Sequence, residues 1–154
     1  MRKKMNDRIE KHIELKALPS RVWRALTDYQ EFGEWFRVQL DGPFTPGQAS
    51  RGSITYPGYE QHKLELIVQK MDPQRLFSFT WHPYALDLKR DYSVERPTLV
   101  EFHLEEADHS TLLLLVESGF DEIPNDRRLE AFQMNDNGWS EQMKNLKNYV
   151  ETSS

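Results

Sequence analysis

The C-terminal part of the chain constrains its fold more than any other segment. Residues Asn125–Glu151 predict a helix of about 25 residues, because inward-facing positions recur there in alternating steps of three and four. This stripe consists of Leu129, Phe132, Asp136, Trp139, Met143, Leu146 and Val150. The run Asn135–Gly138 forms helix poorly, and we expect a kink or a break there. A helix with one apolar face needs a second layer that buries this face.

Segments before this helix predict that the second layer is a β-sheet. Residues 8–16 alternate between apolar and polar side chains, which is typical of a half-buried strand. The turn Asp108–Ser110 joins the last two predicted strands as a hairpin. Further strands are predicted at residues 53–56, 62–71, 76–82, 98–107 and 111–118.

Two short helices are predicted between the first strand and the others. Pro19 opens one of them, and the other covers Tyr29–Phe36, where Gly33 weakens it. The order strand, two helices, strands and long helix predicts an α+β fold. In this fold a curved antiparallel sheet of about six to seven strands surrounds the C-terminal helix. Such an arrangement leaves an elongated apolar cavity between sheet and helix.

Length and composition limit the class of protein. We expect one domain over residues 8–151, after a flexible segment at 1–7 and before a short tail at 152–154. The net charge of −5 argues against a nucleic-acid partner. No apolar run reaches about 18 residues, so we expect no membrane span and a soluble, cytoplasmic protein.

The sequence contains no motif for a cofactor or a metal. The chain has no cysteine, and its five histidines lack the HxH and HExxH spacings of metal ligands. His62 and His82 lie near strand ends, where they would either rim a pocket or be solvated. The motifs GxSxG, P-loop and GxGxxG are absent. We therefore expect no cofactor and do not favour an enzyme.

Aromatic side chains are the main candidates for ligand binding. The chain has 4 Trp, 8 Phe and 6 Tyr, and most of the Trp and Phe lie on periodic apolar faces. They would line a partly hollow interior or, alternatively, form an ordinary core. The predicted ligand-binding residues are Trp35, Phe36, Tyr56, Phe79, Trp81, Phe102, Glu117, Phe120, Phe132, Trp139 and Met143.

Glu117 and Asp136 are the candidate catalytic residues. The register of the last strand is ambiguous because Leu112–Val116 are all apolar, and Glu117 faces inward only if Leu113 and Leu115 do. A carboxylate in an apolar pocket would act as an acid, a base or a ligand anchor. If Asp136 also faces inward, the two carboxylates suit acid–base chemistry. The alternatives are an exposed Glu117 and an Asp136 that a kink turns to water.

Two loops are candidates for the rim of the cavity. Residues 41–51 and 82–97 are rich in turn formers and charges, and loops as long as the second are usually functional or disordered. Their cations would attract an acidic ligand or would simply be solvated. These cations are Arg51, Lys89, Arg90 and Arg96.

Taken together, the segments resemble the START-like superfamily, also called SRPBCC or Bet v-like. The closest resemblance is to the branch related to the activator of the heat-shock protein 90 ATPase, and it covers roughly residues 8–151. It implies the helix-grip fold. A histidine often precedes the SGF motif in this branch, whereas this chain has Glu117 there. The resemblance rests on RVWRALTD (21–28), EWF (34–36), DGPFTPG (41–47), PG (57–58), RLFSFTW (75–81), TLVEFHLE (98–105), SGF (118–120) and GW (138–139).

The resemblance implies several functions, because this superfamily includes carriers, co-chaperone domains and enzymes. We expect first a protein that binds a small hydrophobic or aromatic molecule between the sheet and the last helix. The second expectation is a co-chaperone-like module that binds a chaperone or another protein. The third is a polyketide cyclase or aromatase that uses Glu117, Asp136 and Tyr56.

Overall fold

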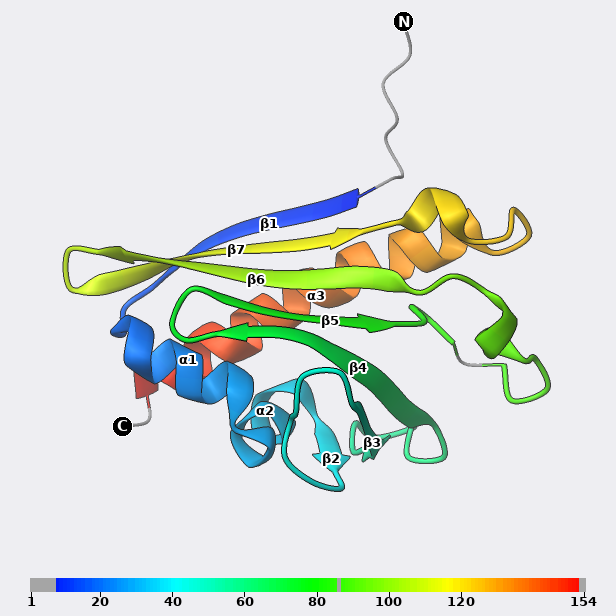
Figure 1. The fold of residues 1–154 in the computed structure, drawn as a ribbon, viewed down its shortest axis with the longest axis horizontal. Coiled ribbons are helices and arrows are strands. Elements are labelled where there is room, and N and C mark those ends of the chain that lie inside the picture. Colours follow the sequence, from blue (N-terminus) through cyan, green and yellow to red (C-terminus); the bar gives the residue numbers. More distant parts are fainter. Residues whose placement is uncertain (1–7, 86, 153–154) are drawn as a thin grey trace, which may run out of the picture.

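A seven-stranded antiparallel sheet and a long C-terminal helix dominate the described part of the chain (Figure 1). The structure is a computed structural model that describes residues 8–85 and 87–152. The predicted flexible segment 1–7, and residues 153–154 of the predicted tail, lie outside the described residues. The elements are β1 (Arg8–Leu15), α1 (Pro19–Thr27), α2 (Tyr29–Phe36), β2 (Val38–Leu40), β3 (Ala49–Ile54), β4 (Lys63–Asp72), β5 (Leu76–Trp81), η1 (Tyr92–Val94), β6 (Thr98–Ala107), β7 (Ser110–Ser118), η2 (Phe120–Glu122) and α3 (Arg128–Thr152).

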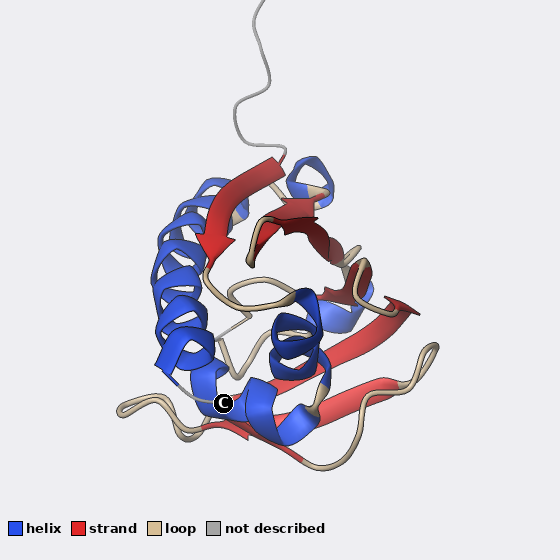
Figure 2. Cartoon of the chain, turned by 90° about the vertical axis from the view of Figure 1, so that its left-hand side faces the viewer, coloured by secondary structure: helices blue, strands red, loops and turns tan. Residues whose placement is uncertain are grey.

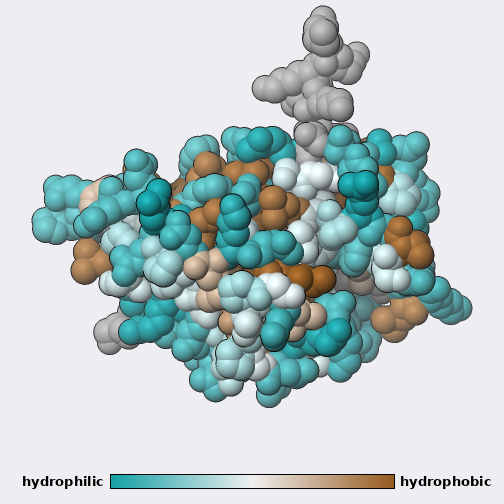
Figure 3. All heavy atoms as spheres, in the orientation of Figure 1, coloured by the Kyte–Doolittle hydropathy of each residue, from teal (hydrophilic) through white to brown (hydrophobic). Residues whose placement is uncertain are grey.

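The sheet has the strand order β1-β7-β6-β5-β4-β3-β2, and neighbouring strands are antiparallel. Figure 2 shows the strands curving around the side on which the helices lie. The helix α3 contacts β1, α1 and α2. The opposite side of the molecule, which faces the viewer in Figure 3, is largely hydrophilic with hydrophobic patches among the polar side chains. This arrangement confirms the predicted α+β class and the sheet around a C-terminal helix.

Pairing with both neighbours fixes the register of β7. Glu117 lies opposite Ile9 of β1 and Val100 of β6, and both of these side chains are buried. Leu113 and Leu115 are also buried on this face, because side chains two residues apart point to the same side of a sheet. The strand therefore turns Glu117 toward the interior.

Phenylalanine side chains fill the space between the sheet and the helices. Phe77, Phe79 and Phe102 have no exposed surface. The ring centroids of Phe77 and Phe79 are 5.8 Å apart, and those of Phe79 and Phe102 are 6.2 Å apart. These separations are typical of packed aromatic pairs, which add to the stability gained from apolar burial. At these positions the aromatic pattern forms a packed core.

Both short helices lie where the sequence predicts them. The Asp28 carboxylate caps α2 by accepting hydrogen bonds from the backbone N–H groups of Gln30 and Glu31 at 2.9 and 3.1 Å. Gly33 weakens this helix intrinsically, but a Cβ atom there would overlap the carbonyl oxygen of Val38. Glycine therefore lets β2 return directly alongside α2.

The first strands of the central region differ from the prediction. The strand predicted at residues 53–56 is observed as β3 at Ala49–Ile54, and the three-residue strand β2 was not predicted. Residues 49–51 carry little apolar pattern, but Gly52 pairs with both Leu40 and Leu64. Pairing on both sides, rather than side-chain alternation, thus defines this strand.

The helix α3 differs from its predicted stripe in the first half. It is unbroken from Arg128 to Thr152, so the predicted kink or break does not interrupt it. Leu129 is 53% exposed, whereas Ala131 is fully buried, so the buried face is displaced from the predicted one. From Trp139 onward the stripe is confirmed, because Met143, Leu146 and Val150 are also buried.

Candidate functional site

An open hollow of about 510 Å³ lies between one end of the sheet and α3, and we call it the α3 cleft. Three groups of residues form it: the region from the end of β3 to the start of β4, the end of β5 with the loop that follows, and one face of α3. Phe36 of α2 lines the inner end. Its lining residues are Phe36, Ile54, Tyr59, His62, Lys63, Leu64, Glu65, Trp81, His82, Pro83, Tyr84, Ala85, Tyr92, Met134, Asn135, Gly138 and Gln142.

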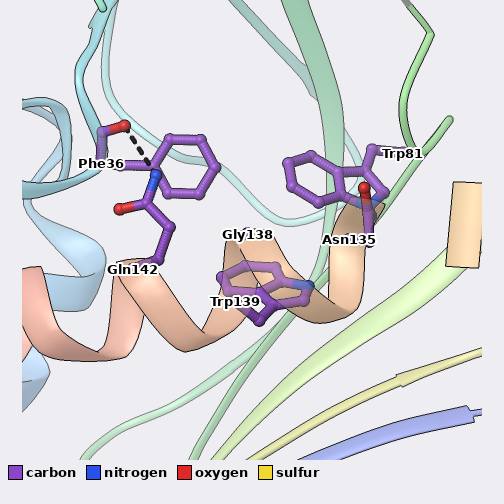
Figure 4. A pocket seen from close by; sticks show the side chains of 6 residues that line it. All are labelled: Phe36, Trp81, Asn135, Gly138, Trp139 and Gln142. Carbon is purple, nitrogen blue, oxygen red and sulfur yellow. Dashed lines mark hydrogen bonds between the residues drawn. The ribbon is translucent and has the colours of Figure 1, made fainter. Parts of the chain in front are cut away.

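The inner end of the α3 cleft continues into a smaller pocket of about 150 Å³. Figure 4 shows the rings of Phe36 and Trp81 beside the turn of α3 that carries Gly138. The centroid of the Trp81 ring is 5.9 Å from Phe36 and 5.7 Å from Trp139. Gln142 holds the Phe36 end by donating its amide N–H to the Phe36 carbonyl at 3.0 Å. The pocket therefore has an aromatic floor formed by Phe36, Trp81 and Trp139.

A buried carboxylate lies behind this floor. Glu117 has no exposed surface. Its Oε2 atom accepts hydrogen bonds from Trp81 Nε1 at 2.8 Å and from Thr98 Oγ1 at 2.6 Å. Its Oε1 atom accepts from Trp139 Nε1 at 2.8 Å and from Asn135 Nδ2 at 2.9 Å. Three of these four donors belong to residues that line the hollows.

The four partners of Glu117 are complementary to an ionised carboxylate. The indole and amide nitrogens of Trp81, Trp139 and Asn135 can only donate, so a proton on Glu117 would have only the hydroxyl of Thr98 as an acceptor. None of the ion pairs found among residues 8–85 and 87–152 includes Glu117. A negative charge held by neutral donors therefore lies directly behind the aromatic floor.

A buried ion pair holds the loop that forms the outer wall of the α3 cleft. Arg127 donates to both carboxylate oxygens of Glu95, with the shortest distance at 2.8 Å, and both side chains are almost fully buried. Arg127 also donates to the carbonyl oxygens of Pro83 and Tyr84 at 2.8 and 3.3 Å. Its guanidinium lies 4.6 Å from the Tyr92 ring centroid. The loop after β5 is thereby fixed to the start of α3.

The sequence did not predict the ion pair between Arg127 and Glu95. Arg127 and Glu95 are separated by 32 residues, and no local spacing links them. The one available signal is the length of the loop between β5 and β6, which was predicted to be functional or disordered. Three of the four predicted rim cations pair with acids. Arg51 pairs with Glu65, Arg90 with Asp126 and Glu95, and Arg96 with Glu122.

The histidines predicted near the pocket rim both line the α3 cleft. His62 precedes β4 and His82 follows β5. The Nδ1 atoms of both rings are buried and have no hydrogen-bond partner among the described residues. Burial lowers the pKa of His82 below its usual 6.5, although the nearby Glu95 carboxylate opposes this shift. Burial therefore favours the neutral form of the His82 ring.

Six other predicted ligand-binding residues lie in two environments. Trp35, Phe79, Phe102 and Met143 are buried in the core, and the Trp35 indole donates to the carbonyl of Ala25 at 2.8 Å. Phe120 is also buried, and it packs edge-on against Phe132 at 5.2 Å. These positions lie outside the lining of the α3 cleft, and their predicted ligand contacts stay predictions.

Tyr56 and Asp136 lie apart from Glu117. Tyr56 is 53% exposed and packs against Tyr59. The Asp136 carboxylate forms an ion pair with Lys11 of β1 at 2.8 Å, and its side chain is 43% exposed. The structure therefore does not form a hydrogen-bonded pair of carboxylates from Glu117 and Asp136 in the α3 cleft.

Two further observations concern metal binding and membrane-spanning helices. Within the described residues, no group of three or more His, Asp or Glu side chains is arranged to hold a metal ion. No helix in the same part of the chain is both long and apolar enough to cross a membrane.

Solved structures with low sequence identity share this fold. The protein MLL2253 from Mesorhizobium loti is 22% identical, with a TM-score of 0.75 over 96% of this chain and 98% of that protein. The Aha1 protein from Colwellia psychrerythraea, solved as a dimer, is 19% identical, with a TM-score of 0.70 over 94% and 96%. DynU16, a protein of the dynemicin biosynthetic locus, is 20% identical, with a TM-score of 0.71 over 95% of this chain. This chain spans only 48% of DynU16.

Sequence comparison with protein families identifies the chain more directly. No protein of curated function matches the sequence significantly. The family described as "Activator of Hsp90 ATPase homolog 1-like protein" matches residues 16–151, which is most of the chain. The match agrees with the resemblance inferred from the sequence motifs and with the helix-grip architecture. The chain therefore belongs to the Activator of Hsp90 ATPase homolog 1-like family, within the SRPBCC superfamily.

Proposed function

We propose that this protein binds a small hydrophobic or aromatic molecule in the α3 cleft. The observation that carries the proposal is the aromatic floor of Phe36, Trp81 and Trp139 at the inner end of the cleft. A volume of about 510 Å³ lies within the range of pockets that hold small organic ligands. The few polar groups among the apolar walls would orient such a ligand.

The rigidity of the walls supports the proposal. Glu117 fixes both floor tryptophans through their indole N–H groups, and Arg127 fixes the loop that forms the outer wall. A cleft whose walls are held before binding loses little conformational entropy when a ligand enters. DynU16, which has the same fold, comes from a biosynthetic locus, but a likeness at 20% identity supports the fold alone.

Gly138 offers a direct test, because it lines the cleft on an exposed turn of α3 and a Cβ atom there would meet no neighbour. Gly138→Leu should fill part of the inner pocket without strain in the helix. We expect this variant to weaken binding of a naphthalene probe at least tenfold, measured by changes in the indole N–H signals in NMR titrations. Gly138→Ala, with one methyl group, is the matched control. Equal binding by both variants and the parent chain would contradict the proposal.

Chaperone binding is the second candidate, favoured by the description of the family. It predicts that the chain stimulates the ATPase of a chaperone of the heat-shock protein 90 class, whether or not Gly138→Leu fills the cleft.

The cyclase-like alternative needs a carboxylate that contacts a ligand. Glu117 is fully buried, and all four of its hydrogen bonds go to the protein's own donors. We therefore propose that Glu117 positions the tryptophans of the binding site and does not contact the ligand.

A further inference from the structure

We propose that the α3 cleft selects a non-anionic aromatic ligand that carries a hydroxyl or amine hydrogen, and that Asn135 accepts this hydrogen. The inference rests on the proposed binding function and specifies the ligand's chemical class. Two observations carry it. They are the orientation that Glu117 imposes on Asn135, and the negative charge of Glu117 behind the aromatic floor.

The indole donors of the inner pocket are already occupied. The indole N–H groups of Trp81 and Trp139 both donate to Glu117. The Gln142 amide donates to the Phe36 carbonyl, and its Oε1 accepts from Asn145 at 3.2 Å. A ligand group that only accepts hydrogen bonds, such as a ketone, would therefore find no indole donor and only the second N–H of the Gln142 and Asn135 amides.

Asn135 also presents an acceptor. Its side chain lines both hollows, and Figure 4 shows it beside Trp81. The carboxylate of Glu117 can only accept, so it fixes the NH₂ group of Asn135 toward itself at 2.9 Å. The Oδ1 atom must then point away from Glu117. Among the described residues no group donates to this Oδ1 atom, which suits it to accept a hydrogen from a ligand.

The charge of Glu117 also favours a ligand that carries a hydroxyl or amine hydrogen. The carboxylate is fully buried without a cation, so little solvent screens its field at the floor. An anionic ligand on the floor would be repelled, whereas the positive end of an O–H or N–H bond would be attracted. Lys63 and Glu65 line the outer part of the α3 cleft, and none of the residues that line the inner pocket carries a charge. Burial also lowers the pKa of His82, which lines the α3 cleft, and so disfavours a cation on this ring.

Three probes of the same shape separate these effects: 2-methylnaphthalene, 2-naphthol and 2-naphthoate, titrated at pH 7 into the parent chain. We expect 2-naphthol to bind about tenfold more tightly than 2-methylnaphthalene, and 2-naphthoate to bind more weakly than both. Asn135→Leu should remove the preference for 2-naphthol over 2-methylnaphthalene and leave the rejection of 2-naphthoate unchanged. Glu117→Gln should reduce that rejection, and the Asn135→Leu result stands even if the Glu117 variant fails to fold.

The outcomes distinguish this inference from the proposed function. If 2-naphthoate binds as tightly as 2-naphthol, or if Asn135→Leu keeps the preference for 2-naphthol, the inference is wrong. In either of these cases the proposed function survives, provided that 2-methylnaphthalene binds to the parent chain and that Gly138→Leu blocks this binding. If none of the probes binds, both are overturned.

Discussion

Glu117 is a buried acid whose four partners are all neutral. Burying a charge is costly unless hydrogen bonds replace the lost water, and here two donors reach each oxygen at 2.6–2.9 Å. The donors come from β5, β6 and α3, so a single side chain ties two strands to the helix. The carboxylate fixes the positions of its donors, and two of those donors form the floor of the α3 cleft.

The pH dependence of stability tests the buried state of His82. Burial lowers its pKa in the folded chain below 6.5, so the unfolded chain takes up this proton first as the pH falls. Stability is therefore fully present above about pH 6.5 and is lost as the pH falls from there to the folded-state pKa. We expect His82→Gln to lose less free energy of unfolding than the parent chain between pH 7.5 and 5.5, measured by urea denaturation. His109→Gln, at a side chain that is 93% exposed, should retain the parent's dependence. An unchanged pH dependence in His82→Gln would refute this assignment.

At the scale of single elements, two helical glycines should respond in opposite ways to alanine. Alanine favours helix over glycine by about 1 kcal/mol, which Gly138→Ala should gain because its Cβ meets no neighbour. Gly33→Ala gains the same propensity, but its Cβ overlaps the Val38 carbonyl oxygen and forces β2 away from α2. We expect this variant to lose about 1–3 kcal/mol in chemical denaturation. Similar stabilisation of both variants would show that the contact with Val38 does not constrain α2.

Elements whose signal is local could be predicted from the sequence. The alternation in β1 and β6, and the proline at the start of α1, placed these elements almost to the residue. Short β2 and the start of β3 could not be placed, because pairing with their neighbours defines them. The side that Glu117 faces could not be determined either, since five apolar residues precede it and only the partners Ile9 and Val100 fix the register.

At the scale of the whole molecule, the candidate site depends on contacts between distant segments. Glu117 is 36 residues from Trp81 and 22 from Trp139, and Arg127 is 32 from Glu95. No periodicity reports such pairs, because periodicity describes one element at a time. The aromatic pattern alone therefore does not distinguish residues of the packed core from residues of the cleft floor. The polar contacts that distinguish them join distant segments and become visible only in the folded chain.

The pairing of Arg127 with Glu95 gives the last prediction, because it holds the loop between β5 and β6 against α3. Arg127→Lys keeps the charge but loses the planar, multiply donating contact with Glu95 and the bonds to the Pro83 and Tyr84 carbonyls. We expect a loss of about 1–3 kcal/mol in the free energy of unfolding, because buried acceptors lose their donors. Limited proteolysis should cut this loop faster, and the naphthalene probe should bind more weakly.

Arg96→Lys is the matched control, since this side chain is 80% exposed and its contact with Glu122 is 3.6 Å long. Its stability should stay within about 0.5 kcal/mol of the parent chain, as is usual for exposed ion pairs. If Arg127→Lys weakens probe binding without faster proteolysis, Arg127 acts on the ligand rather than on the loop. If it changes neither, the wall of the α3 cleft does not depend on this ion pair, because other contacts of the loop with the segment before α3, such as Arg90 with Asp126, suffice to hold it.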